Sequence, residues 1–267
     1  MKQIKGTPLR PSISIANEFY KPVAKALEVM AKEIKDEMRG VFAEYSLDGA
    51  MDAGSLPIQA QFALNRILKK WTQRFNDLSD RAVAKMIKQI TANSKATLGM
   101  SLKDLSDSVT LDTGLIDDKL RQIIRASTEE STNLIKLIPQ KYIADVQGQV
   151  MRSISGGGGL QTLIPYLNNK YNGDKRHARN TALDQTRKAY NNITAGRMQS
   201  LGFKKYQWLH VGGSQHPRQD HIAMSGNVYN LEDPPIIGTM YGQEVRGKPG
   251  DLPACRCQII PIISFEE

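Results

Sequence analysis

The residues best suited to chemistry lie in the last quarter of the chain, which holds both cysteines and three of the four histidines. In an extended strand residues i and i+2 point to the same side, so the thiols of Cys255 and Cys257 would share one face. Two histidines on that face, His221 first and His216 second, would complete a tetrahedral zinc site of two sulfurs and two nitrogens. The alternative is two small buried thiols that pack a strand in a reducing environment.

A catalytic role for the same residues is a second alternative. With a metal nearby, His221 beside Asp220 could activate water for phosphodiester hydrolysis, with Asp184 upstream. A cysteine and a histidine could also form a nucleophilic pair. A catalytic metal needs an open ligand position, and the sequence shows none. We therefore expect that the chain is not an enzyme.

The elements that position these residues follow from the spacing of apolar side chains. Steps of three and four residues predict a helix over Val23 to Tyr45 and a second over Leu64 to Met86. After Gly202 short apolar runs alternate with Gly- and Pro-rich turns, which predicts short strands at 206–211 and 259–263. Further helices are expected at 101–109, at 117–155 with a break at Pro139, at 160–171 and at 180–201.

This pattern predicts an α+β protein of 267 residues with two parts. The first, 1–127, is an extended, mainly helical region for binding a partner. The second, 128–267, is a small domain of helices packed on a short, mostly antiparallel sheet. The glycine run Gly156 to Gly159 is the plainest hinge in the sequence, because glycine neither holds a helix nor restricts φ.

The charge balance favours an acidic neighbour. Lys and Arg number 36 against 27 Asp and Glu, which gives a formal net charge of +9. Such a balance favours DNA, RNA or an acidic protein surface. A basic stripe falls close to one face of the second helix, and it is either a solvated face or a contact for nucleic acid or an acidic partner. Its members are Arg66, Lys70, Arg74, Arg81, Lys85 and Lys88.

The chain reads as a soluble, cytoplasmically made protein. Its basic start is not followed by an apolar stretch of the kind that a signal peptide needs. No window approaches the roughly 18 continuous apolar residues of a membrane span. We therefore expect no membrane partner.

Several short motifs occur in an order and spacing that carry a family resemblance. The first are Asn133–Pro139, Ala182–Lys188, Leu201–Phe203 and Tyr206–Trp208, and they continue with Pro217–His221, Ser225-Gly226, Pro234-Pro235, Pro249-Gly250 and Cys255–Cys257. Together they resemble the bacteriophage Mu F-like minor head proteins, also called phage head morphogenesis proteins. The resemblance covers about half of the chain, from Thr128 to Pro261.

The resemblance implies a structural minor head protein of a tailed phage, associated with the portal vertex and needed for head assembly. The implied location is the virion, with the host cytoplasm during assembly. The implied partners are the portal protein and capsid or scaffold proteins, and double-stranded DNA by non-specific contacts. The alternative is a metal-dependent nuclease or a toxin-like effector delivered with phage DNA.

The family pattern also singles out residues around the cysteines, and we expect structural roles for them. The helical segment Asp184-Gln185-Thr186 would present hydrogen-bonding side chains to the strand segment. Arg218 and Arg256 would bridge carboxylates such as Asp184 or Asp220. Trp208 would lie in the core rather than stack on a base.

Overall fold

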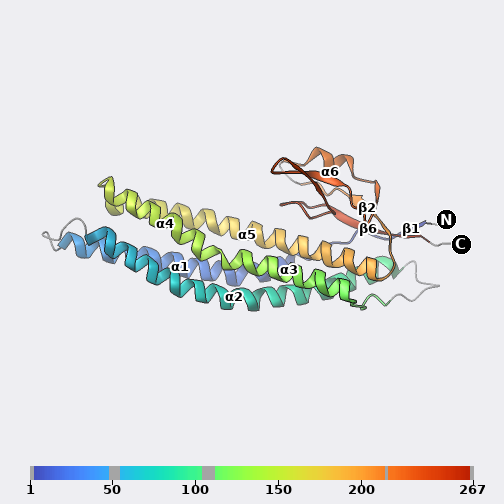
Figure 1. The fold of residues 1–267 in the computed structure, drawn as a ribbon, viewed down its shortest axis with the longest axis horizontal. Coiled ribbons are helices and arrows are strands. Elements are labelled where there is room, and N and C mark those ends of the chain that lie inside the picture. Colours follow the sequence, from blue (N-terminus) through green and yellow to red (C-terminus); the bar gives the residue numbers. More distant parts are fainter. Residues whose placement is uncertain (1–2, 48–54, 104–111, 214–215, 265–267) are drawn as a thin grey trace. The chain divides into compact units, whose positions relative to one another are not determined.

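The computed structural model describes residues 3–47, 55–103, 112–213 and 216–264 (Figure 1). The helices are α1 (Ile13–Leu47), α2 (Ser55–Leu102), α3 (Asp118–Lys136), α4 (Ile138–Ser155), α5 (Gly159–Ser200) and α6 (Gln219–Ala223). The strands are β1 (Gln3–Lys5), β2 (Lys205–Leu209), β3 (Val228–Asn230), β4 (Ile236–Met240), β5 (Gln243–Arg246) and β6 (Gln258–Ser264). The predicted α+β class is confirmed. None of the helices described is long and apolar enough to cross a membrane.

The chain divides into two compact units, and each draws on separate segments. Unit 1 comprises Met1–Asn17, Ala84–Glu129 and Ala182–Glu267, and unit 2 comprises Glu18–Val83 and Glu130–Thr181. The limits of the units fall inside helices, one of them between Glu129 and Glu130 of α3. The division into a partner-binding part, 1–127, and a second domain, 128–267, stays a prediction. Periodicity shows that a helix exists, but it does not show where that helix passes from one core to another.

Unit 2 is a four-helix bundle in which every neighbouring pair of helices is antiparallel. Between α1 and α2 an ion pair joins Glu33 to Lys70, and between α2 and α4 Gln147 donates to Asn65. The ring closes through α5, because Tyr166 contacts α4 and Lys35 of α1 donates to Asn168 of α5. The interior is the apolar seam of each helix, which is the usual solution for amphipathic helices of this length.

The helix α1 begins ten residues earlier than predicted. Its buried seam starts at Ile15 and Phe19 and continues at the expected Val23 and Leu27. Pro22 lies inside the helix, although proline interrupts helical hydrogen bonding. Burial of the residues before Pro22 compensates for that interruption, so the helix continues through it.

The glycine run forms the turn between α4 and α5 within unit 2. Gly156 caps α4, and Gly157 and Gly159 adopt positive φ values of 69° and 47°. Only glycine adopts such values without strain, which explains two positions of the run. Its role as a hinge stays a prediction.

Two of the expected helices, 160–171 and 180–201, form the single helix α5. Lys170 explains part of this continuity, because its ammonium group pairs with Asp174 one turn later at 2.9 Å and with Asp145 of α4 at 2.6 Å. The pair with Asp174 spans Gly173 and holds the polar middle of the helix. Of the expected helix 101–109, residues 104–109 lie outside the described part, and α2 itself ends at Leu102.

Unit 1 places the last part of α5 between α2 and the strand region. One face of α5 turns to α2, where Tyr190 and Thr194 contact Thr97 and Ser94. Residues on the other face contact the strands and loops, since Gln199 donates to a carbonyl after β3 and Asn191 and Asp184 reach the loop before β6. The helix is therefore the support on which the C-terminal region is built.

The sheet of unit 1 is antiparallel throughout, in the order β1-β6-β2-β3. The two strands predicted from apolar runs are confirmed as β2 and β6, and they pair with Trp208 opposite Ile259. Alternate residues of β2, Tyr206 and Trp208, are completely buried. A separate hairpin is formed by β4 and β5.

Candidate metal centre

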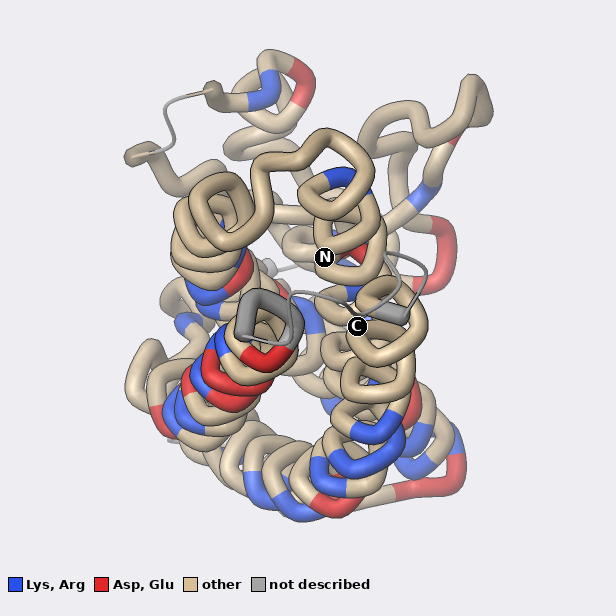
Figure 2. Tube along the Cα trace, turned by 90° about the vertical axis from the view of Figure 1, so that its left-hand side faces the viewer, with Lys and Arg blue, Asp and Glu red and all other residues tan. Residues whose placement is uncertain are grey.

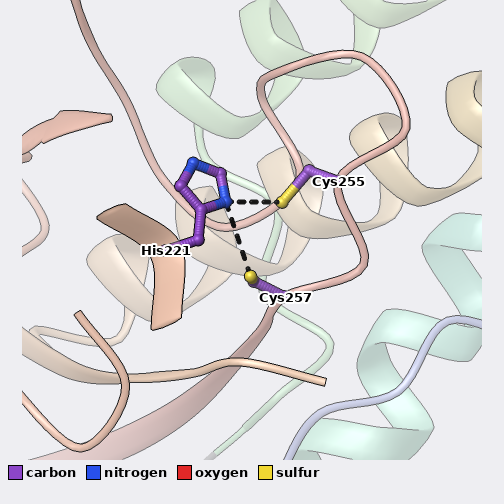
Figure 3. A group of neighbouring side chains, drawn as sticks. All are labelled: His221, Cys255 and Cys257. Carbon is purple, nitrogen blue, oxygen red and sulfur yellow. Dashed lines mark hydrogen bonds between the residues drawn. The ribbon is translucent and has the colours of Figure 1, made fainter. Parts of the chain in front are cut away.

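His221, Cys255 and Cys257 come together in unit 1 (Figure 3). His221 belongs to the short helix α6, and the cysteines lie in the loop that leads into β6. The three potential ligand atoms all lie within 4.8 Å of one another. The juxtaposition that was predicted for these three residues is therefore present.

The distances within this cluster suit a tetrahedral ion. His221 Nδ1 is 3.5 Å from Cys255 Sγ and 3.6 Å from Cys257 Sγ. A zinc ion with ordinary Zn–S and Zn–N bonds separates a sulfur and a nitrogen ligand by about 3.6 Å at the tetrahedral angle. The three side chains thus need little movement to bind one.

The imidazole of His221 is oriented by a backbone carbonyl. Its Nε2 lies 3.0 Å from the oxygen of Ile237, and a carbonyl can only accept, so the proton is on Nε2. Nδ1 then faces the two sulfurs. The Trp208 indole and the imidazole form a T-shaped contact with a centroid distance of 5.1 Å. Metal-binding histidines are commonly held by such a second hydrogen bond.

The two thiols share their hydrogen bonds unequally. The hydrogen bonds with Cys257 and with His221 lower the pKa of Cys255. The hydrogen bond between the two thiols raises the pKa of Cys257. The hydrogen bond with Cys255 raises the pKa of His221. One sulfur with thiolate character beside an imidazole is the chemistry that a metal ligand set needs.

The loop that carries the cysteines is fixed by α5. Asn191 Nδ2 donates to the carbonyl of Pro249 at 2.8 Å, and the N–H of Gly250 donates to Cys255 Sγ at 3.4 Å. Gly250 has a φ of 90°, and a Cβ there would lie 2.3 Å from Asn191 Nδ2. Asp184 Oδ1 accepts the N–H of Ala254 at 2.7 Å, and burial raises the pKa of this carboxyl.

The helical segment expected to serve the strand region does so through Asp184. Gln185 and Thr186 are buried, and the Thr186 hydroxyl donates within α5 to the carbonyl of Ala182. Trp208 is buried in the sheet, as expected of a core residue. Sequence reasoning missed Asn191, because an asparagine inside a helix gives no sign of the loop that it holds.

The fourth ligand position has two candidates. His216 is exposed and lines the same small cavity of about 20 Å³ as the three clustered residues. His210, at the end of β2, has Nδ1 3.6 Å from Cys257 Sγ. The structure thus adds His210 beside the predicted His216.

Comparison with known proteins identifies the segment that holds this cluster. Residues 144–260 match the family described as Phage Mu protein F like protein. The chain carries a phage Mu protein F like segment. The resemblance drawn from the motifs is therefore confirmed, and the family suggests a phage head morphogenesis protein.

A curated protein of Haemophilus influenzae, described only as an uncharacterized protein, is 22% identical over 265 residues. The match covers 98% of this chain and 56% of that relative, so the chain spans about half of the relative's length. No solved structure matches the chain.

The two arginines of the Mu F-like motif are structural donors, but their acceptors differ from those expected. Arg218 Nη2 donates to the carbonyl of Pro253 at 3.0 Å, and Arg256 Nη1 donates to the carbonyl of Gly213 at 2.6 Å. Backbone carbonyls thus take the place of the expected carboxylates. A guanidinium group has several donors in a fixed plane, which suits it to tying loops together.

The predicted basic stripe is partly neutralised on the surface of α2. Arg66 pairs with a glutamate of α1, Lys70 Nζ lies 2.8 Å from Glu33, and the Arg74 guanidinium lies 4.9 Å from the Trp71 ring centre. Figure 2 shows Lys and Arg interleaved with Asp and Glu along the helices. The other members of the stripe, all exposed, are Arg81, Lys85 and Lys88. A DNA contact by this stripe stays a prediction.

Proposed function

We propose that the chain is a structural, non-enzymatic protein of a tailed-phage head, located at the portal vertex and needed for head assembly. The observation that carries the proposal is the Mu F-like segment together with the burial of its only cysteine and histidine cluster among the described residues. Cys255, Cys257 and His221 are 2–3% exposed. A substrate has no access to groups buried to this degree. A structural role does not need such access.

The partners in this proposal are the portal protein and the capsid or scaffold proteins. The bundle of unit 2 offers long helices with charged outer faces, which suit docking along other helices. The protein would be part of the virion, and it would be present in the host cytoplasm during assembly. Non-specific contact with packaged DNA through the exposed members of the basic stripe is a subsidiary part of the proposal.

The experiment is mass spectrometry of gradient-purified heads and mature particles from the phage or prophage that encodes the chain. The portal protein serves as the internal reference. We expect the chain at a low, fixed ratio to portal in both particles. Absence from both would contradict the proposal and favour the nuclease or effector alternative.

We further propose that His221, Cys255 and Cys257 hold a structural zinc ion, with His210 as the fourth ligand in preference to His216. The support is the 3.6 Å approach of His210 to Cys257, which equals the sulfur to nitrogen separation around zinc. Such an ion would fasten the loop before β6 to α6 and so fix the strand region of unit 1. It would need no open ligand position.

Two matched variants test the fourth ligand. His210→Ala should weaken zinc retention in a competition with a colorimetric chelator, and His216→Ala should leave it at the wild-type level. The reverse pattern would assign the position to His216. If both variants and Cys257→Ser retain zinc as the wild type does, the proposed ligand set is wrong.

A further inference from the structure

The hairpin of β4 and β5 closes with a turn whose backbone conformation is unfavourable for the residue at its first central position. Met240 pairs with Gln243, so the loop consists of Tyr241 and Gly242 alone. Their φ values of 52° and 78° are those of a type I′ turn, in which both central residues are left-handed. Glycine, asparagine and aspartate favour the first position, and a bulky aromatic residue there is uncommon.

The aromatic ring at this position serves no packing purpose in the described part of the chain. The side chain of Tyr241 is 100% exposed, and that of Met240 beside it is 39% exposed. A tyrosine that is strained in its backbone and unburied in its own fold does not stabilise that fold. Tyrosine is, however, among the residues that contribute most to protein interfaces, because its ring is large, rigid and amphipathic.

The charges around the tip favour a protein as the partner. Residues 238–244 contain no Lys or Arg, and Glu244 is their single charge. The guanidinium of Arg246 is engaged by Asp233 at 2.8 Å and by the carbonyl of Pro234 at 3.0 Å. A nucleic acid or an anionic membrane would need cations beside the aromatic ring.

We propose that Tyr241 is a binding anchor that inserts into an apolar pocket of another head protein. The ring and the Met240 side chain would fill the pocket, and the phenol hydroxyl would donate to an acceptor at its rim. The identity of the partner as a head protein rests on the proposed function, whereas the anchor itself rests on the hairpin.

The first test is Tyr241→Asn, because asparagine is the residue that this turn favours. We expect an unchanged or higher melting temperature together with at least about a tenfold drop in the amount of the chain in heads relative to portal. Tyr241→Phe keeps the ring and should retain most of the incorporation. Normal incorporation of Tyr241→Asn would overturn the proposal, and so would a lower melting temperature, which would mean that the ring stabilises its own fold.

A crosslinking test separates this proposal from the proposed function. The photoreactive residue p-benzoylphenylalanine replaces Tyr241 or, as an exposed polar control on α3, Gln122 in cells that produce the phage. An adduct with a head protein from position 241 alone supports the anchor, even if the chain is absent from finished particles. No adduct, a nuclease-sensitive adduct, or an adduct with a second copy of the chain would each overturn it.

Discussion

The two units of the protein are held together by different kinds of side chain. Unit 2 buries the apolar seams of its helices, and among its described residues the buried polar ones are the small serines Ser79, Ser131 and Ser153. Unit 1 buries an asparagine, a glutamine, an arginine and a histidine. Apolar packing tolerates many sequences of similar volume, whereas buried polar groups need particular partners.

Unit 1 therefore depends more than unit 2 on particular side chains in particular places. Arg197 of α5 is 1% exposed and donates to Ser94 Oγ at 3.3 Å and to the carbonyl of Leu115 at 3.3 Å. The carbonyl of Thr91 accepts a further hydrogen bond from it at 3.3 Å. Together with the Cys and His cluster, such contacts position short strands and loops that have little apolar surface of their own. Four predictions test this contrast.

The largest effect is expected from the double substitution Cys255→Ser and Cys257→Ser. Loss of the proposed zinc ligands should lower the free energy of unfolding by an amount on the order of 5 kcal/mol, because binding a structural metal is coupled to folding. Urea unfolding followed by circular dichroism and by Trp fluorescence, with zinc content measured in parallel, checks this. A double variant with unchanged stability and metal content would refute the proposed structural zinc site.

Replacement of the buried arginine by Arg197→Leu should cost about 3 kcal/mol, because several buried acceptors in unit 1 lose their donor. The matched control is Arg121→Leu on α3, whose exposed guanidinium pairs with Asp118. An exposed pair of this kind contributes about 0.5 kcal/mol or less. Equal losses in the two variants would show that burial of Arg197 does not matter to unit 1.

In unit 2 the truncation Leu64→Ala should also cost about 3 kcal/mol, since it leaves a cavity in a fully buried seam. The loss should be the same with and without a metal chelator, because unit 2 has no part in the cluster. A loss that appears only in the presence of zinc would contradict the separation of the two cores. Thermal unfolding with and without EDTA measures it.

The smallest effect concerns Asp251, whose pKa is raised by burial. The folded state therefore binds its proton more tightly than the unfolded state does, and this contribution to stability is lost as pH rises through the folded pKa. Asp251→Asn carries no such charge, so its stability relative to wild type should increase between about pH 4 and about pH 7. Urea unfolding midpoints of both proteins at both pH values test this. A stability of Asp251→Asn relative to wild type that falls or stays constant as pH rises would contradict it.

The sequence predicted the fold class, the two sheet strands and the juxtaposition of His221 with both cysteines. These follow from local rules, namely apolar periodicity and the alternation of side chains in extended segments. The continuous helix α5 and the early start of α1 were missed, because Pro22 and the polar middle of α5 resemble helix breaks. Contacts from distant residues override those local signals.

Two features of unit 1 could not be predicted from local sequence patterns. Arg197 lies within a basic stretch of the sequence and gives no sign that it is buried. The approach of His210 to Cys257 depends on the place where β2 ends beside β6. Both are consequences of tertiary packing, which residue spacing alone does not determine.

We expect the Cys and His cluster to fasten the strand region of unit 1, whereas the bundle of unit 2 is stabilised by its apolar core. Amide hydrogen exchange with and without EDTA tests it most directly. We predict faster exchange at 205–209 and 258–264 once zinc is removed, with unchanged exchange at 64–75. Equal protection of the strand region in both conditions would contradict the account.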